Sequence, residues 1–124
     1  LIAPLERDGM VRRPSIPNDC EHNAHMYYVL VEDADTRTEV LNYMNQQQGI
    51  NAVFHYVPLH SSPAGLKYGR ADGNLDVTDL LSARLIRLPL WIGMTEQQQT
   101  QVVSALEQAL CKVRSYAEPR AVLA

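Results

Sequence analysis

Two histidines and a tyrosine lie together in one six-residue stretch, His55-Tyr56-Val57-Pro58-Leu59-His60. Imidazole and phenol groups both donate and accept hydrogen bonds, so they suit a site for a polar ligand. The proline between them fixes the loop, because its ring locks one backbone dihedral angle. We therefore interpret His55, Tyr56 and His60 as candidate ligand-binding residues. The simpler alternative is that each histidine satisfies a backbone carbonyl and that the tyrosine packs with its hydroxyl bonded locally.

The other two histidines lie in a second polar cluster, Cys20-Glu21-His22-Asn23-Ala24-His25. Asn23 and His25 are further candidate ligand-binding residues. The alternatives are that Asn23 caps a turn and that His25, at the start of a strand, is a core histidine bonded to the backbone. Thiolate and imidazole groups suit zinc as well, and this loop could supply several ligands. An alternative is therefore a zinc site made of Cys20, His22, His25, His55 and His60. The chain has no CxxC or HExxH motif to strengthen it.

The residues before the first candidate loop predict a βαβ unit. Residues 26–31 are a continuous aliphatic and aromatic run, typical of a central strand buried on both faces. Thr36 and Glu39 have the spacing of a capping box, which predicts a helix that starts at Thr36 and stops at Gly49. Residues 50–55 predict the next strand. The two strands are expected to be parallel or to share one sheet, and the second strand positions the loop that begins at His55.

Helices and strands continue after that loop. Residues 61–74 predict a loop with one short helical turn at 64–68, and residues 76–84 and 86–88 predict a helix and a short strand. A second capping box then starts the clearest helix of the chain. Its residues are Thr95 and Gln98, and its apolar stripe comprises Val102, Val103, Leu106, Ala109, Leu110 and Val113.

The two ends of the chain carry less information. Residues 10–13 predict a short strand, and residues 115–124 predict a flexible tail, because apolar periodicity stops there. The fold class is therefore α+β, with a small antiparallel or mixed sheet that contains the βαβ unit and is packed by two or three helices.

Length and charge restrict the classes of function. A chain of 124 residues fits one domain, and its net charge of −3, without a basic cluster, argues against a nucleic-acid partner. No apolar run approaches the roughly 20 residues that span a membrane, and the first residues given do not show a basic region followed by an apolar secretory stretch. We therefore expect a cytoplasmic protein without a membrane partner, in which Cys20 and Cys111 are free thiols.

Three stretches of the chain stand in an order and spacing that are informative together: residues 20–28, 52–60 and 63–65. They resemble the C-terminal small domain of the DegT/DnrJ-type aminotransferases, and the likeness extends over residues 14–108. The resemblance implies a fold-type I enzyme, dependent on pyridoxal phosphate, that moves an amino group from glutamate to a dTDP-4-keto-6-deoxyhexose. The resemblance also implies that the complete enzyme is a homodimer. Residues 1–114 would be the small domain, which supplies a wall of the sugar-nucleotide site.

The resemblance also implies roles for the candidate residues. His55, Tyr56 and His60 would bind sugar hydroxyls or order the surroundings of the catalytic lysine, with Asn23 and His25 nearby. Arg84 would face the nucleotide phosphates, although an arginine near a helix end also complements the helix dipole without a ligand.

Chemistry in this family needs a lysine that forms a Schiff base with the cofactor. Lys67 and Lys112 are the two lysines of the sequence, and neither lies in a stretch that resembles the cofactor lysine. We expect no catalytic residue here and no cofactor bound by this chain alone. The dTDP-sugar and glutamate would bind with the help of a large domain, since the chain resembles a piece cut from a longer protein. A freestanding ligand-binding module is the remaining alternative.

Overall fold

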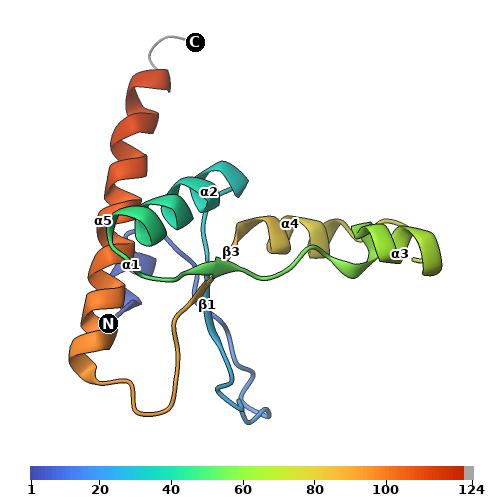
Figure 1. Ribbon diagram of the computed structural model, residues 1–124, viewed down its shortest axis with the longest axis horizontal. Coiled ribbons are helices and arrows are strands. Elements are labelled where there is room, and N and C mark those ends of the chain that lie inside the picture. Colours follow the sequence, from blue (N-terminus) through green and yellow to red (C-terminus); the bar gives the residue numbers. More distant parts are fainter. Residues whose placement is uncertain (122–124) are drawn as a thin grey trace.

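A three-stranded antiparallel sheet forms the centre of the molecule (Figure 1). The computed structural model describes the backbone of residues 1–121 and the side chains of residues 1–115. The strand order is β1 (Tyr27–Leu30), β3 (Leu85–Leu88) and β2 (Val53–Phe54). Because β1 and β2 both pair antiparallel with β3, they run parallel to each other with the last strand between them. The α+β class and the shared sheet of the predicted βαβ unit are confirmed.

The helix α2 (Ala34–Asn42) begins earlier than the sequence predicted. Its N-cap is Asp33, whose extended backbone lets the carboxylate accept a hydrogen bond from the Thr36 amide at 2.8 Å. The prediction that Thr36 and Glu39 form the cap was therefore wrong, because a carboxylate three residues upstream takes that amide. The helix continues into a π-helical turn, Tyr43–Gln47, and Gly49 follows with a positive φ of 63°.

The predicted capping box of the last helix is confirmed. The Gln98 amide donates to Thr95 Oγ1 at 3.2 Å, and the Thr95 amide donates to Gln98 Oε1 at 2.9 Å. The helix α5 then runs over Glu96–Ala121, so the backbone is helical in most of the predicted tail, and the flexibility of residues 115–124 stays a prediction. A helix that has already formed adds one hydrogen bond per residue, so it needs no apolar stripe to continue. Residues 122–124 of that predicted tail lie outside the described residues.

The core lies where α2 and α5 pack against each other and against the sheet (Figure 1). Leu106 of α5 is fully buried together with Val40 of α2 and Met44 of the π-helical turn, and Val29 and Ile86 contribute from the sheet. A short N-terminal helix, α1 (Ala3–Arg7), adds Leu5 to the same cluster. The prediction of two or three helices on the sheet is confirmed. Among the described residues, no helix is both long and apolar enough to cross a membrane.

Two predicted strands are shorter than expected. The strand at residues 10–13 is reduced to one bridge, in which Arg12 and Leu30 exchange backbone hydrogen bonds of 2.8 and 2.9 Å. The strand at residues 50–55 is reduced to β2, because Ile50 and Ala52 bond elsewhere. The Ile50 amide donates to the Met44 carbonyl, and the Ala52 carbonyl accepts from Asn45 Nδ2 at 2.8 Å.

The residues that connect β2 to β3 in the sequence form an arm that projects from the sheet (Figure 1). It consists of a 3₁₀ turn η2 (Leu59–Ser61), the helix α3 (Pro63–Tyr68), a loop, and the helix α4 (Asp76–Arg84). The predicted helical turn, the predicted helix at 76–84 and the strand that follows it are confirmed. Every residue of α3 and α4 is exposed or only half-buried, so the arm has no core of its own.

Candidate functional site

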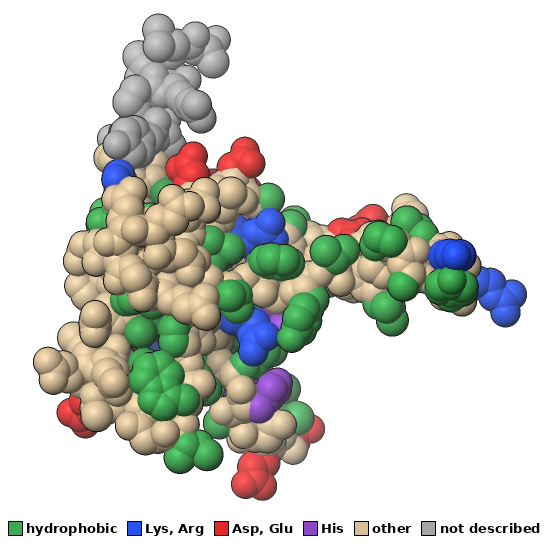
Figure 2. All heavy atoms as spheres, viewed as in Figure 1, with side chains coloured by type: hydrophobic (Ala, Val, Ile, Leu, Met, Phe, Trp, Pro, Cys, Tyr) green, Lys and Arg blue, Asp and Glu red, His purple; other side chains and the backbone are tan. Residues whose placement is uncertain are grey.

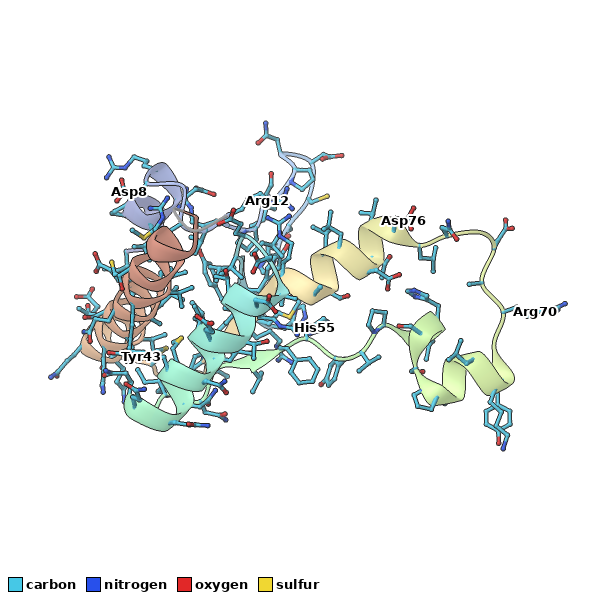
Figure 3. All side chains as sticks on the ribbon, turned by 90° about the horizontal axis from the view of Figure 1, so that it is seen from above. Asp8, Arg12, Tyr43, His55, Arg70 and Asp76 are labelled. Carbon is cyan, nitrogen blue, oxygen red and sulfur yellow. The ribbon has the colours of Figure 1, made fainter. Side chains whose placement is uncertain are left out.

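The loop of residues 55–60, here called the site loop, leaves the sheet at the base of the arm. Figure 3 shows His55 at this base, whereas Arg70 lies at the far end of the arm. His55 is half-buried, and its Nδ1 atom is buried without a hydrogen-bond partner among the described residues. Tyr56 is 69% exposed, and its ring lies 5.0 Å from the His55 ring, centroid to centroid. The two predicted residues therefore lie side by side, one turned inward and the other open to a ligand.

The backbone of the site loop changes direction sharply at Tyr56. This residue has a φ of +53°, a left-handed conformation that is uncommon for a bulky residue. The chain then reaches Pro58, whose carbonyl accepts hydrogen bonds from the amides of Ser61 and Ser62 at 3.2 and 3.0 Å. Pro58 thus starts the 3₁₀ turn that carries His60, in agreement with its predicted role in fixing the loop.

His60 faces α4. Its Nε2 atom lies 3.0 Å from Asp79 Oδ1, and its side chain is 18% exposed. The two atoms are close enough for an ion pair when the imidazole is protonated, but they are not aligned for a hydrogen bond. His60 therefore connects the two halves of the arm, whereas Tyr56 is the more accessible of the two side chains.

An open hollow of about 260 Å³ lies between the site loop, α2 and α4. Its walls combine one cation, one carboxylate and two aromatic rings with small and apolar groups, a mixture that suits a polar ligand. The lining residues are Arg37, Phe54, Tyr56, Val57, Pro58, Asp79, Ser82 and Ala83. Sequence reasoning missed Arg37, Phe54 and Asp79, because each comes from a different element and no local spacing connects them.

The second polar cluster is used mainly for a local turn. The ring of His25 bonds to Asn23 Oδ1 at 2.6 Å, and the Ala24 amide donates to His22 Nδ1 at 2.9 Å. Asn23 and His25 are exposed, on a loop that leads into β1 and lies apart from the arm in Figure 1. The turn-capping interpretation of Asn23 is supported, whereas the core interpretation of His25 was wrong. The prediction that these two residues contact a ligand stays a prediction.

The zinc alternative gains no support from this arrangement. Its proposed ligands are divided between the loop before β1 and the site loop. Within the part of the chain that the structure describes, no three histidine, cysteine or acidic side chains come together as a metal site requires. Cys20 and Cys111 are both exposed free thiols.

Arg84 is engaged within the fold. Its Nε atom donates to the Val31 carbonyl at 2.7 Å, at the end of β1. This bond ties the last turn of α4 to the sheet. The predicted contact with nucleotide phosphates would have to use the remaining guanidinium donors.

Both lysines make contacts within their own surroundings. Lys112 Nζ lies 3.3 Å from Gln47 Oε1 and 4.9 Å from the centroid of the Tyr43 ring, where α5 faces the π-helical turn. Lys67 lies over the ring of its exposed neighbour Tyr68. The prediction that this chain alone binds no pyridoxal phosphate stays a prediction.

Comparison with known proteins gives a consistent result. Residues 3–107 match the sequence profile of the DegT/DnrJ/EryC1/StrS aminotransferase family. The pleiotropic regulatory protein of Geobacillus stearothermophilus is 23% identical over 92 residues, which cover 74% of this chain and 25% of that protein.

Two solved structures share the fold. NtdA from Bacillus subtilis, with bound cofactor PMP, matches with a TM-score of 0.73 and 21% identity, over 88% of this chain and 25% of NtdA. DesV from S. venezuelae, in complex with a ketimine intermediate, matches with a TM-score of 0.73 and 24% identity, over 87% of this chain and 29% of DesV. The chain thus spans about a quarter of the length of NtdA and of the curated relative.

Proposed function

Because the chain belongs to the DegT/DnrJ/EryC1/StrS aminotransferase family, we propose that it is the small domain of a sugar aminotransferase that depends on pyridoxal phosphate. The family match covers most of the chain, and it is the observation that carries the proposal. The two structural relatives contain PMP and a ketimine intermediate, which supports cofactor chemistry in the larger protein. When bound, the cofactor stabilises negative charge at the carbon that gains or loses the amino group.

The motifs quoted above are the basis for a proposal about the substrates. We propose that the complete enzyme moves an amino group from glutamate to a dTDP-4-keto-6-deoxyhexose, and that it acts in the cytoplasm as a homodimer. The resemblance to enzymes of this type is carried by the sequence segments in and next to the site loop, residues 52–60 and 63–65. A keto sugar offers hydroxyl groups that donate and accept hydrogen bonds, which matches the polar and aromatic lining of the hollow.

The contribution of this chain is a wall of the sugar site. Tyr56 presents an exposed hydroxyl at the hollow, and His55 offers a buried ring nitrogen that lacks a partner within the described chain. A buried polar atom without a partner is uncommon, so a ligand or another part of the protein is expected to satisfy it. His60 acts mainly through its contact with Asp79, which orients the loop.

The reactive amine and much of the cofactor site come from elsewhere in this proposal. The exposed apolar residues of the arm support it, because Leu66 and Val77 are 73% and 70% exposed. Exposed apolar side chains that gather on one part of a molecule are typical of a region that packs against more protein. The chain alone is accordingly expected to be inactive.

The test uses the complete gene product that contains this chain. Glutamate-dependent amination of the dTDP-keto sugar is measured for the wild type, for Tyr56→Phe and for Tyr68→Phe, which is a control on the exposed end of α3. A lost hydrogen bond to an uncharged hydroxyl should raise the KM of the Tyr56 variant for the sugar by about 2- to 10-fold, with the control unchanged. Equal turnover and equal sugar affinity in all three proteins would reject the site assignment. Turnover by the 124-residue chain alone would reject the small-domain proposal.

A further inference from the structure

Arg37 connects three elements around the site loop. It belongs to α2, its Nη1 atom donates to the Ser82 carbonyl of α4 at 3.1 Å, and its guanidinium carbon lies 5.7 Å from the centroid of the Phe54 ring. Arginine over an aromatic face at this distance is an attractive cation–π contact. One guanidinium therefore holds the last residue of β2 and the second half of α4 in fixed relation to α2.

The site loop needs such support. Tyr56 adopts a left-handed backbone conformation, which costs free energy in a residue with a large side chain and persists only where the surroundings impose it. After Tyr56, the contact between His60 and Asp79 holds the chain to α4. Before Tyr56, the corresponding support is Phe54, which is 47% exposed and therefore is not fixed by burial alone. The guanidinium of Arg37 lies over this ring.

Stability alone does not explain an arginine at this position. The Nε atom of Arg37 is buried and has no hydrogen-bond partner among the described residues. An unsatisfied buried donor destabilises a folded protein. A methionine would fill similar space without that donor. It would make neither the hydrogen bond to the Ser82 carbonyl nor the cation–π contact with the Phe54 ring.

We propose that Arg37 is a positioning residue for the site loop: by clamping Phe54 to α4, it holds Tyr56 in the left-handed conformation at the hollow. The proposal about the loop concerns this chain alone. Only its consequence for sugar binding rests on the proposed function.

The first experiment follows the 124-residue chain by NMR, with the variants Arg37→Met, Arg37→Lys and the control Arg70→Met at the exposed end of the arm. In Arg37→Met, we expect the amides of Ser61 and Ser62 to exchange about tenfold faster, because a hydrogen bond and a cation–π contact are lost. The Cα and Cβ shifts of Tyr56 should move toward extended values. Arg37→Lys should restore part of both effects, and Arg70→Met should match the wild type.

Several outcomes would overturn the proposal. An unchanged site loop in a folded Arg37→Met protein would do so, and so would an equal acceleration of exchange in β1 and β3, which would indicate general structural support. If Arg37→Met does not fold, Phe54→Leu provides the second route, because it removes the ring and keeps an apolar side chain. The loop should then loosen although Arg37 is present, and a rigid loop would contradict the clamp.

The second experiment separates this proposal from the proposed function. In the complete enzyme, Arg37→Met should raise the KM for the sugar nucleotide several-fold, whereas Arg70→Met should leave it unchanged. A loosened loop with an unchanged KM would leave the clamp in place and reject contact of the loop with sugar. A rigid loop would reject the clamp, whatever the kinetics.

Discussion

At the scale of single residues, Asp33 shows how one side chain sets the start of a helix. The backbone amide and the side chain of Thr36 hydrogen-bond to the Asp33 carboxylate, and these bonds lower its pKa because they stabilise the charged form. The carboxylate also lies at the N-terminus of α2, where a negative charge interacts favourably with the helix dipole.

Replacing Asp33 by alanine should lower the free energy of unfolding by about 1 kcal/mol, the usual value of an N-cap. Glu39→Ala is the matched control, because Glu39 would matter equally only if it belonged to a capping box. Urea unfolding followed by circular dichroism measures both variants. A larger loss in the Glu39 variant would contradict the cap described above.

The contribution of Asp33 should depend on pH with a definite sign. Because its pKa is lowered in the folded state, the cap stabilises fully above the ordinary carboxyl pKa of about 3.9, and this stabilisation is lost as the pH falls through the lowered value. The difference in unfolding free energy between the wild type and Asp33→Ala should therefore shrink between about pH 5 and pH 2. A difference that is constant over that range would reject the charged cap.

The sequence was informative about residues that act locally and silent about those that act across the fold. It predicted the cap at Thr95 and the role of Pro58, because both depend on neighbours within a few positions. It did not predict that His60 faces Asp79 or that Arg37 reaches Ser82. Such contacts depend on how elements pack, which local spacing does not encode.

At the scale of elements, the packing of η2 against α3 depends on a glycine. A Cβ atom at position 65 would lie 1.6 Å from the Leu59 carbonyl oxygen, far inside contact distance. The turn that carries His60 can therefore form in this geometry only with glycine at that position.

Gly65→Ala should displace η2 from α3 and break the contact of His60 with Asp79, at a local cost of about 1–3 kcal/mol, as is usual for overpacking. Leu66→Ala serves as the control, since that side chain is 73% exposed in the same helix. Hydrogen exchange at the Ser62 and Gly69 amides measures the effect. Because the arm has little buried surface, the exchange of core amides should change little in either variant.

Element type was easier to predict than element length. Helices α3, α4 and α5 follow from proline, capping residues and apolar spacing, all of which are local. The strand β2 is short because Asn45 and Met44 bond to residues 50–52 in place of a neighbouring strand. Residues 50–52, which the sequence predicted as the start of a strand, therefore bond to the preceding π-helical turn.

At the scale of the whole molecule, stability is concentrated in the core and is low in the arm. Figure 2 shows apolar side chains spread along the arm, which projects from the rounded body. The periodic residues Val77 and Leu80 predicted an apolar helix face, but they are 70% and 56% exposed. Periodicity identifies an apolar face and does not identify what covers it, so the sequence could not show that α4 leaves the body.

Leu106→Ala should lower the free energy of unfolding by about 2–5 kcal/mol, because Leu106 is fully buried between α5, α2 and the sheet. Glu107→Ala is the control on the exposed side of the same helix turn and should change it by less than about 0.5 kcal/mol. Thermal and urea unfolding measure both. A small effect at Leu106 would contradict the described core.

The arm should also make the 124-residue chain self-associate at high concentration, because its apolar side chains are uncovered. Sedimentation velocity of Leu66→Ser combined with Val77→Ser should show less association than the wild type. Substituting two polar exposed residues, Lys67→Ser and Thr78→Ser, provides the control. Equal association of both double variants would show that the arm is not responsible.

The strand order has a consequence for how the chain is made. The central strand β3 is the last of the three to leave the ribosome, and β1 and β2 pair with it and not with each other. A nascent chain that ends before Leu85 therefore holds two outer strands without a partner, and their open edges are exposed to aggregation. The sheet cannot assemble until residues 85–88 have been made. The time for which the edges of β1 and β2 stay exposed during synthesis therefore depends on how fast the arm is translated.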